Sequence, residues 1–125
     1  MNTSRISKVV ILTDLHLRSD YMPGFLDKQV ETLLYYANRK PCSHVVINGD
    51  VFERRNPTGE ELLAFHRLLD GIKCTNIIVN RGNNDTLRKD GTSETVLSLF
   101  SDKATIVTDT KTIRIGTIDF DFIPH

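Results

Sequence analysis

HVVINGD, residues 44–50, decides the fold of this chain. Its centre is short, apolar and β-branched, which is typical of a strand buried on both faces, and the chain becomes polar immediately after it. Two further runs have the same form, ISKVVIL at residues 6–12 and TNIIVN at residues 75–80. All three runs lead into polar residues, so the sequence predicts three buried strands that are each followed by a polar loop.

Segments with the residue pattern of helices lie between these strands. After the turn signal Pro23-Gly24, apolar residues recur at helical intervals as far as Lys40. Thr58 and Glu61 have the spacing of a capping box, and Gly71 is expected as the C-cap of the helix that they begin. Each pair of neighbouring strands is therefore predicted to be joined by one helix.

The remainder of the chain adds a short helix and three short strands. They are expected at residues 93–100, 104–107, 111–115 and 117–123, with Gly116 at a tight turn. The order β-α-β-α-β-α-β-β-β predicts an α/β fold with a mostly parallel sheet and right-handed crossovers. Ligands gather at the carboxyl ends of the strands in such sheets, which is where the three polar loops are expected.

The last predicted strand alternates apolar and acidic side chains from Ile118 to Phe122, which suggests a strand in the middle of a sheet. The chain ends shortly afterwards, at His125. We therefore expect residues 1–125 to form a single domain whose sheet is cut off, either the N-terminal part of a longer protein or a shortened relative.

Composition argues against several classes of protein. Sixteen basic residues balance sixteen acidic ones, so the chain has no bulk attraction to nucleic acid or to an anionic membrane. No apolar run approaches the roughly 20 residues that span a bilayer, and the N-terminus lacks a signal-peptide pattern; both favour a cytoplasmic location and no membrane partner. Cys42 and Cys74 each precede a predicted strand, which leaves a close approach open, but they are interpreted as reduced, structural thiols.

The polar loops contain residue types that bind metals. The candidate ligands, taken strand by strand, are Asp14 with His16, then Asp50, then Asn83. A carboxylate with an imidazole suits Mn, Fe or Zn, and Asp50 offers a second carboxylate that is able to bridge two metals. Two metals about 3.5–4 Å apart hold a phosphate and activate a water for in-line attack. Each pattern alone is common in turns, but their succession at three strand ends favours a metal site.

These motifs resemble those of the calcineurin-like metallophosphoesterase superfamily, whose pattern is D-x-H, G-D-x-x-(D/E) and G-N-H-(D/E). The corresponding segments are DLH at residues 14–16, GDVFE at 49–53 and GNND at 82–85. More narrowly, the chain is similar to the SbcD-type nuclease subunit of DNA double-strand-break repair and to its phage recombination counterparts. The segments that carry this likeness are TDLHL at 13–17, GDVFERRNPT at 49–58 and DFIP at 121–124.

The resemblance implies the N-terminal half of a metallophosphoesterase α/β sandwich. The metal ligands that it implies are Asp14 and His16 for the first metal, Asp50 as the bridge and Asn83 for the second. It also implies that Glu53 and Asp85 orient these groups or meet the phosphate. The implied cofactor is a pair of divalent metals, Mn first and Mg, Fe or Zn as alternatives. The implied partners are DNA, an ATPase of the structural-maintenance type and a second copy of the chain.

Two departures from the family pattern bear on activity. Asn84 stands where the family has a histidine that acts on the scissile phosphate, and a carboxamide cannot give up a proton near neutral pH. Losing a general acid typically costs about 10²–10⁴ in rate. The later histidines of the family are also missing, because His44, His66 and His125 match none of their positions. We expect a DNA phosphodiesterase that is weakly active or inactive; the alternatives are a non-catalytic assembly or DNA-binding module and a small-molecule phosphoesterase.

Four arginines lie near the motifs in the sequence: Arg54, Arg55, Arg81 and Arg88. At the carboxyl edge of the sheet they are positioned to contact a phosphate backbone, despite the neutral total charge. The alternative interpretation is that they are solvated surface residues, which is the usual state of arginine.

Overall fold

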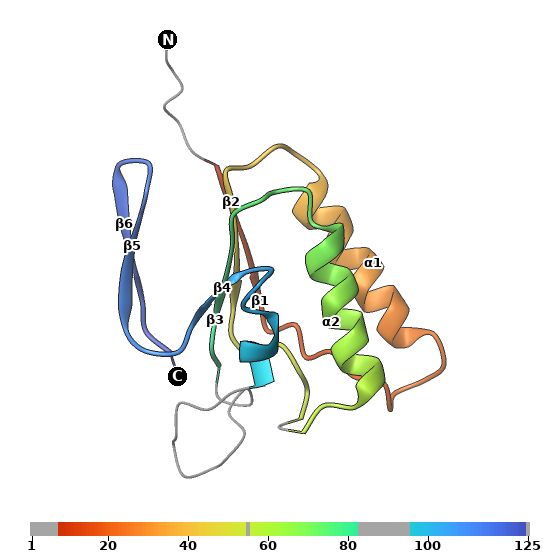
Figure 1. The fold of residues 1–125 in the computed structure, drawn as a ribbon. Coiled ribbons are helices and arrows are strands. Elements are labelled where there is room, and N and C mark those ends of the chain that lie inside the picture. Colours follow the sequence, from red (N-terminus) through yellow and green to blue (C-terminus); the bar gives the residue numbers. More distant parts are fainter. Residues whose placement is uncertain (1–7, 55, 83–95, 125) are drawn as a thin grey trace.

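The computed structural model describes residues 8–54, 56–82 and 96–124. Within these residues the centre is a four-stranded parallel sheet in which each strand lies next to its neighbour in the chain (Figure 1). Its strands are β1 (Val9–Thr13), β2 (His44–Asn48), β3 (Ile77–Asn80) and β4 (Thr105–Val107). The predicted α/β fold with a mostly parallel sheet is confirmed.

The register of the sheet sets the position of the polar loops. β1 pairs with β2 as far as Thr13 opposite Asn48, and Asn48 lies opposite Asn80 at the end of β3. The three strands therefore end at one level, and the loops that follow them leave the sheet side by side. Elements cover both faces of the sheet, which explains why its strands are nearly continuous apolar runs.

Two helices cover one face of the sheet (Figure 1). α1 (Phe25–Asn38) follows Gly24, whose φ of 82° is a left-handed conformation that glycine adopts without strain. α2 (Gly59–Gly71) begins with the predicted capping box: Thr58 Oγ1 accepts from the Glu61 amide at 3.2 Å, and Glu61 Oε1 accepts from the Thr58 amide at 2.8 Å. The largest fully buried side chains of the core are Phe52, Phe65, Leu17, Ile47 and Leu68.

The end of α2 differs from the prediction. Gly71 is not a left-handed C-cap; it lies in the last turn of the helix, and Ile72 leaves the helix in an extended conformation. Asn38, which ends α1, satisfies this terminus instead: its Nδ2 donates to the Gly71 carbonyl oxygen at 2.8 Å, and its Oδ1 accepts from the Lys73 amide at 2.9 Å. A Cβ at position 71 would lie 2.8 Å from both methyl groups of Leu34, so a larger residue there would require the Leu34 side chain to move.

The last two strands form a separate antiparallel hairpin, β5 (Lys111–Ile115) and β6 (Ile118–Phe122), with Gly116 at its turn. The expectation that the final strand lies in mid-sheet is wrong, since among the described residues β6 pairs with β5 alone. The alternation has another cause: Phe122 packs on the second face of the sheet, whereas its neighbour Asp121 is exposed.

The remaining boundaries agree with the prediction within a few residues. The short helix expected at residues 93–100 is the 3-10 helix η2 (Val96–Phe100), and residues 93–95 lie outside the described residues. β1 starts at Val9, and residues 6 and 7 of the predicted strand also lie outside. None of the described helices has the length and apolar character that a membrane span requires.

Candidate metal centre

Three of the predicted metal ligands come together at the carboxyl ends of β1 and β2. One donor atom from each of Asp14, His16 and Asp50 lies within 4.8 Å of the other two. Asp14 is exposed, whereas His16 and Asp50 are half-buried, so the cluster opens to solvent on one side. The cause is the register, because Thr13 and Asn48 end their strands at the same level and direct both loops to one place.

All three cluster residues have a left-handed backbone. The φ angle is 54° at Asp14, 47° at His16 and 47° at Asp50, and within the described chain the non-glycine residues with positive φ are these three. Asp and His tolerate this region better than most residue types, but it still costs roughly 1–2 kcal/mol per residue. Strain of this kind persists only where the surroundings enforce it, and it concentrates at functional sites.

Backbone hydrogen bonds fix the two loops against each other. The His16 amide donates to the Asp50 carbonyl oxygen at 2.9 Å, and the Leu17 amide donates to that of Val51 at 2.8 Å. The Glu53 amide donates back to the Leu17 carbonyl oxygen at 3.0 Å. The loops therefore continue as a short parallel ladder beyond the sheet, and this ladder enforces the strained positions.

The third loop approaches the second one through two glycines. A Cβ on Gly82 would overlap the Asp50 backbone nitrogen and would lie 2.8 Å from both Asp50 Oδ1 and the Gly49 Cα, so a side chain at position 82 would displace the backbone and the carboxylate of Asp50. Gly49 itself has a φ of 81°, which glycine adopts without strain. The glycines of the second and third motifs thus have a steric role, since only bare backbone leaves room for Asp50.

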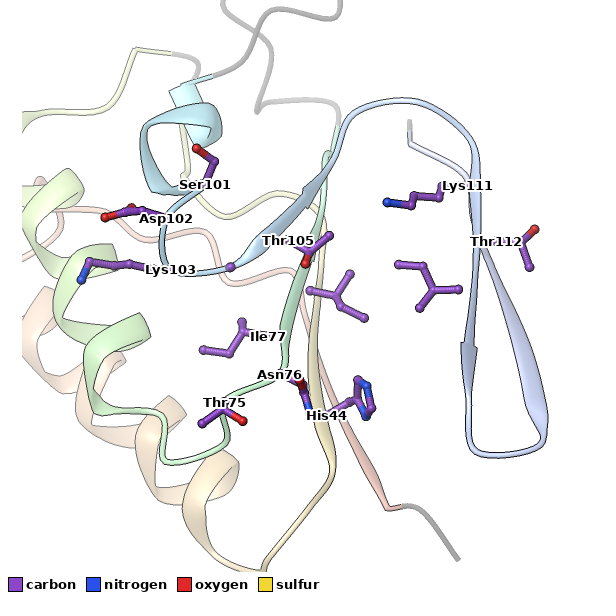
Figure 2. A pocket seen from close by; sticks show the side chains of 13 residues that line it. His44, Thr75, Asn76, Ile77, Ser101, Asp102, Lys103, Thr105, Lys111 and Thr112 are labelled. Carbon is purple, nitrogen blue, oxygen red and sulfur yellow. The ribbon is translucent and has the colours of Figure 1, made fainter. Parts of the chain in front are cut away.

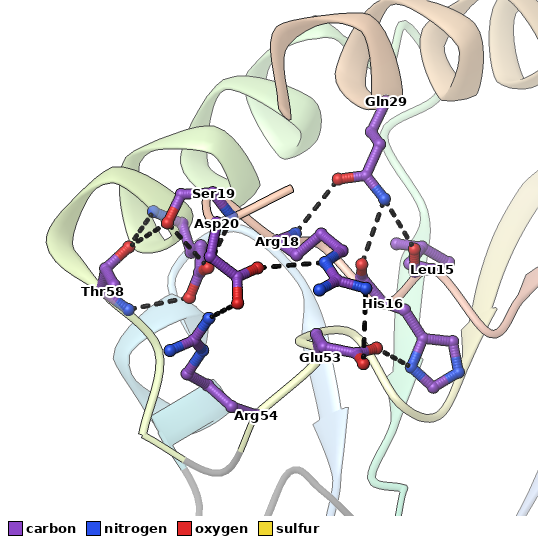
Figure 3. Close-up of polar contacts among 10 residues, drawn as sticks. Leu15, His16, Arg18, Ser19, Asp20, Gln29, Glu53, Arg54 and Thr58 are labelled. Atoms are coloured by element: carbon purple, nitrogen blue, oxygen red, sulfur yellow. Dashed lines mark hydrogen bonds and ion pairs between the residues drawn. The ribbon is translucent and has the colours of Figure 1, made fainter. Parts of the chain in front are cut away.

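Glu53 lies beside the cluster histidine (Figure 3). Its Oε1 is 3.2 Å from His16 Nδ1, an ion-pair distance without the angle of a hydrogen bond, and His16 Nε2 lies 3.8 Å from Asp14 Oδ1. A carboxylate at one ring nitrogen commonly orients a metal-binding histidine so that the other nitrogen is the ligand. Two carboxylates and an imidazole held in this way fit a divalent transition metal such as Mn, Fe or Zn.

Arg18 extends these contacts away from the cluster (Figure 3). Its Nη1 lies 3.8 Å from Glu53 Oε2, and its Nε donates to Asp20 Oδ1 at 3.0 Å. Arg54, a predicted phosphate contact, pairs with the other Asp20 oxygen at 2.6 Å. The hydrogen bond from Arg18, followed by the charges of both arginines, lowers the pKa of Asp20. In this structure Arg54 therefore meets a carboxylate of its own chain.

Two helices hold the loop that carries His16. Gln29 of α1 donates from Nε2 to the His16 carbonyl oxygen at 3.1 Å, and its Oε1 accepts from the Arg18 amide at 3.1 Å. Glu61 of α2 is 0% exposed, and its Oε2 accepts from the amide and the hydroxyl of Ser19 at 2.7 and 3.0 Å. Because a buried carboxylate needs these partners, the loop and α2 are bound into one unit.

The sequence prediction missed a row of polar side chains next to the cluster. Thr13, Asn48 and Asn80 end β1, β2 and β3 and lie opposite one another. Asn80 is 6% exposed; its Nδ2 donates to Asn48 Oδ1 at 3.0 Å, and its Oδ1 has no hydrogen-bond partner among the described residues. A signal was present in the sequence, namely one polar residue at the end of each otherwise apolar strand.

Two residues of the cluster, Asp14 and Asp50, line a recess of about 250 Å³ together with Arg81. Of the predicted phosphate contacts within the described residues, Arg81 is the one that lines this recess. A larger recess of about 620 Å³ lies between the sheet and the hairpin, and the residues that line it include His44, Thr105 and Lys111 (Figure 2). In the part of the chain that the structure describes, this larger recess has no comparable group of ligand side chains, so the smaller one is the candidate site.

Five predicted site residues lie outside the described residues: Arg55, Asn83, Asn84, Asp85 and Arg88. Their roles as a metal ligand, as the replacement of the family's histidine and as phosphate contacts stay predictions.

Comparison with known proteins supports the same interpretation of the site. A sequence model of the family described as calcineurin-like phosphoesterase matches residues 7–122, which is nearly the whole chain. Among curated proteins, no sequence matches the chain. Metallophosphoesterases use divalent metals, and the cluster of Asp14, His16 and Asp50 lies within the matched region. The chain therefore belongs to the calcineurin-like phosphoesterase family.

Proposed function

We propose that this chain is a two-metal phosphodiesterase domain that acts on DNA, with low turnover because Asn84 replaces a general acid. The observation that carries the proposal is the convergence of Asp14, His16 and Asp50, each in a strained backbone conformation, at the carboxyl edge of a parallel sheet. Divalent metals bound there would neutralise the charge of a phosphate and supply a water that ionises near neutral pH.

Each of the site residues would have a different role. Asp14 and His16 would hold one metal, Asp50 would bridge, and Asn83 would complete the second position. Glu53 would keep the His16 ring in the orientation that presents Nε2. Arg81, in the wall of the same recess, would hold a phosphate oxygen.

Asn84 would retain part of the lost role. Its carboxamide can donate a hydrogen bond to the leaving oxygen, but it cannot transfer a proton to it. Asp85 would then have no imidazole to orient. A site of this kind binds metal and substrate and turns over slowly.

DNA as the substrate is proposed from the resemblance to SbcD-type nuclease subunits. From the same resemblance we propose Mn as the metal, and a structural-maintenance-type ATPase and a second copy of the chain as partners. We also propose a cytoplasmic location. Because the net charge is zero, contacts with nucleic acid would have to come from local cations such as Arg81.

Calorimetric titration with MnCl₂ tests the metal centre. The unaltered chain should bind Mn²⁺ at two sites, and Asp50→Ala should abolish two-site behaviour because this carboxylate would be shared by both metals. Asp109→Ala is the matched control, since Asp109 is an exposed carboxylate between β4 and β5. If Asp50→Ala binds Mn²⁺ as the unaltered chain does, the metal centre is wrong.

Mn²⁺-dependent hydrolysis of a simple phosphodiester and of linear DNA tests the reaction. Asn84→His should raise the rate by about 10²–10⁴-fold while the affinity for Mn²⁺ stays the same. Equal, negligible rates in both proteins, with metal binding intact, would support a non-catalytic assembly or DNA-binding module. A faster reaction of the histidine variant on small phosphoesters than on DNA would support the small-molecule alternative.

A further inference from the structure

Two thiols lie together at the end of the sheet that is opposite the metal centre. Cys42 lies two positions before the start of β2, and Cys74 lies three positions before the start of β3. On the paired strands Val45 lies opposite Ile77, 32 positions later in the chain, and Cys74 follows Cys42 by the same 32 positions. The register of the parallel pair therefore brings the two cysteines next to each other.

Local contacts hold the two thiols in this arrangement. Cys74 Sγ donates to the carbonyl oxygen of Ser43, the neighbour of Cys42, at 3.2 Å, and Asn76 Nδ2 donates to the same oxygen at 3.0 Å. Both cysteines also line the same recess. Each cysteine lies three positions before a residue of the pair Val45 and Ile77. Paired strands lie about 4.7–4.9 Å apart, a spacing within the Cα separation of about 4.4–6.8 Å that a disulfide requires.

Solvent reaches both thiols. Cys42 and Cys74 are half-buried and line one recess of about 380 Å³, together with the exposed Lys40 and Lys73. Both cysteines are free in the structure. The pair is thus positioned for a reaction that a small molecule can start and that the second thiol can complete.

We propose that Cys42 and Cys74 form a dithiol modification site that closes into an intramolecular disulfide when it meets a small-molecule disulfide such as oxidised glutathione. The reduced pair is the resting state. This site is independent of the proposed phosphodiesterase function, since it lies at the amino ends of β2 and β3, whereas Asp50 and Gly82 follow their carboxyl ends.

The reaction is a thiol–disulfide exchange in two steps. One cysteine thiolate attacks a sulfur atom of the small disulfide, forms a mixed disulfide and releases one small thiolate. The second cysteine loses its proton to solvent, attacks the protein sulfur of the mixed disulfide and releases the second small thiolate. The protein thiols lose two electrons in total and the small disulfide gains them, so no further oxidant takes part.

The environment makes this exchange slow at neutral pH. Burial, followed by the neighbouring Cys74, raises the pKa of the Cys42 thiol. Lys40 and Lys73 are the charged residues that line the recess. Both are exposed to solvent, and the pKa of Cys42 stays raised beside them. Since the thiolate is the attacking species, formation of the disulfide should accelerate as the pH rises towards the raised pKa of Cys42.

Exposure of the folded, reduced chain to oxidised glutathione tests the proposal. Samples are quenched with acid, alkylated and weighed by intact mass spectrometry. The expected product is a monomer that has lost two hydrogen atoms, carries no glutathione and has no thiol left to alkylate. Cys42→Ser and Cys74→Ser should each stop at a stable glutathione adduct, because the resolving thiol is gone.

The comparison with unfolded chain shows whether the fold is responsible. The second step, in which one thiol of the protein attacks the mixed disulfide on the other, should be at least about tenfold faster in buffer than in concentrated guanidinium chloride, because the fold holds the thiols in proximity. Equal rates of this second step in the two conditions would overturn the proposal. So would a folded chain that keeps glutathione on both cysteines, or a disulfide that links two chains.

Discussion

His16 Nδ1 lies 3.2 Å from Glu53 Oε1, so the acidic residue of the second motif contacts the histidine of the first. The two residues come from loops that follow different strands, and the backbone ladder between these loops sets their separation. Glu53 thereby influences which ring nitrogen of His16 faces Asp14, even though Glu53 is not one of the clustered ligands.

This contact predicts the effect of altering Glu53. Glu53→Ala should lower the affinity for Mn²⁺ by about 10–100-fold, because the His16 ring loses its orienting carboxylate. Glu53→Gln should lose less affinity, since an amide oxygen of the same size keeps a polar contact with Nδ1. Calorimetric titration measures both, and Glu31→Ala on the exposed side of α1 is the control. An unchanged affinity in the alanine variant would contradict the orienting role.

The close approach of the second and third loops predicts the effect of a single methyl group. Gly82→Ala should destabilise the fold by about 1–3 kcal/mol and weaken Mn²⁺ binding, because its Cβ would displace Asp50. Gly59→Ala is the matched control: a Cβ there would meet nothing within 4 Å, and the helical position favours alanine. Urea denaturation gives the stabilities, and equal values for the two variants would refute the steric argument.

The buried carboxylate of Glu61 in α2 predicts that the stability of the fold depends on its contacts with the loop that carries His16 and Ser19. Glu61→Ala removes the acceptor for the Ser19 amide, the Ser19 hydroxyl and the Thr58 amide, and should cost about 1–3 kcal/mol of stability. Glu60→Ala alters the exposed neighbour and should stay within about 0.5 kcal/mol of the unaltered chain. Hydrogen exchange adds a local readout, since the Ser19 amide should lose its protection in the first variant and keep it in the second.

An ion pair between α2 and the segment before β4 predicts a pH dependence. Lys103 Nζ donates to Asp70 Oδ1 at 2.6 Å, and this hydrogen bond is the main reason why the pKa of Asp70 is lowered and that of Lys103 is raised. A lowered carboxyl pKa contributes stability above its ordinary value that is lost as the pH falls through the lowered value. A raised amine pKa contributes stability below its ordinary value that is lost as the pH rises through the raised value.

Lys103→Met should therefore lower the urea midpoint slightly near neutral pH, because both groups lie near the surface. The difference from the unaltered chain should disappear in acid below the lowered Asp70 pKa and shrink in high salt. Lys40→Met, an exposed lysine elsewhere, is the control. A difference that persists in acid would show that Lys103 stabilises the fold through packing and not through its charge.

Features that depend on neighbouring positions were predictable. The capping box of Thr58 and Glu61 was recognised because its partners lie within one helical turn. The strand at residues 44–48 was predicted to the residue, because a β-branched run buried on both faces is bounded by polar residues. The cluster of Asp14, His16 and Asp50 was predicted for the same local reason, since these residues closely follow two such strands, whereas the role of Asn83 in the third motif stays a prediction.

Features that depend on distant positions were not. Gly71 was expected as a C-cap, but Asn38 supplies the cap from 33 positions away, and the close neighbour of Gly71 is Leu34 of the other helix. The alternation that ends in Phe122 showed correctly that one face of the strand is buried. It could not show which surface buries that face, and the strand belongs to a hairpin instead of mid-sheet.

By itself the sequence determined the chemical identity of the site: two carboxylates and an imidazole at the ends of successive parallel strands, where such residues must share one edge of a sheet. Only the tertiary structure decided that Asp14, His16 and Asp50 approach within 4.8 Å with left-handed backbones. It also decided that Glu61, a helix-capping residue, holds the loop that carries His16, through hydrogen bonds from Ser19. The physical reason is that these distances depend on sheet register and helix packing, which join segments far apart in the chain and leave no mark on local residue preferences.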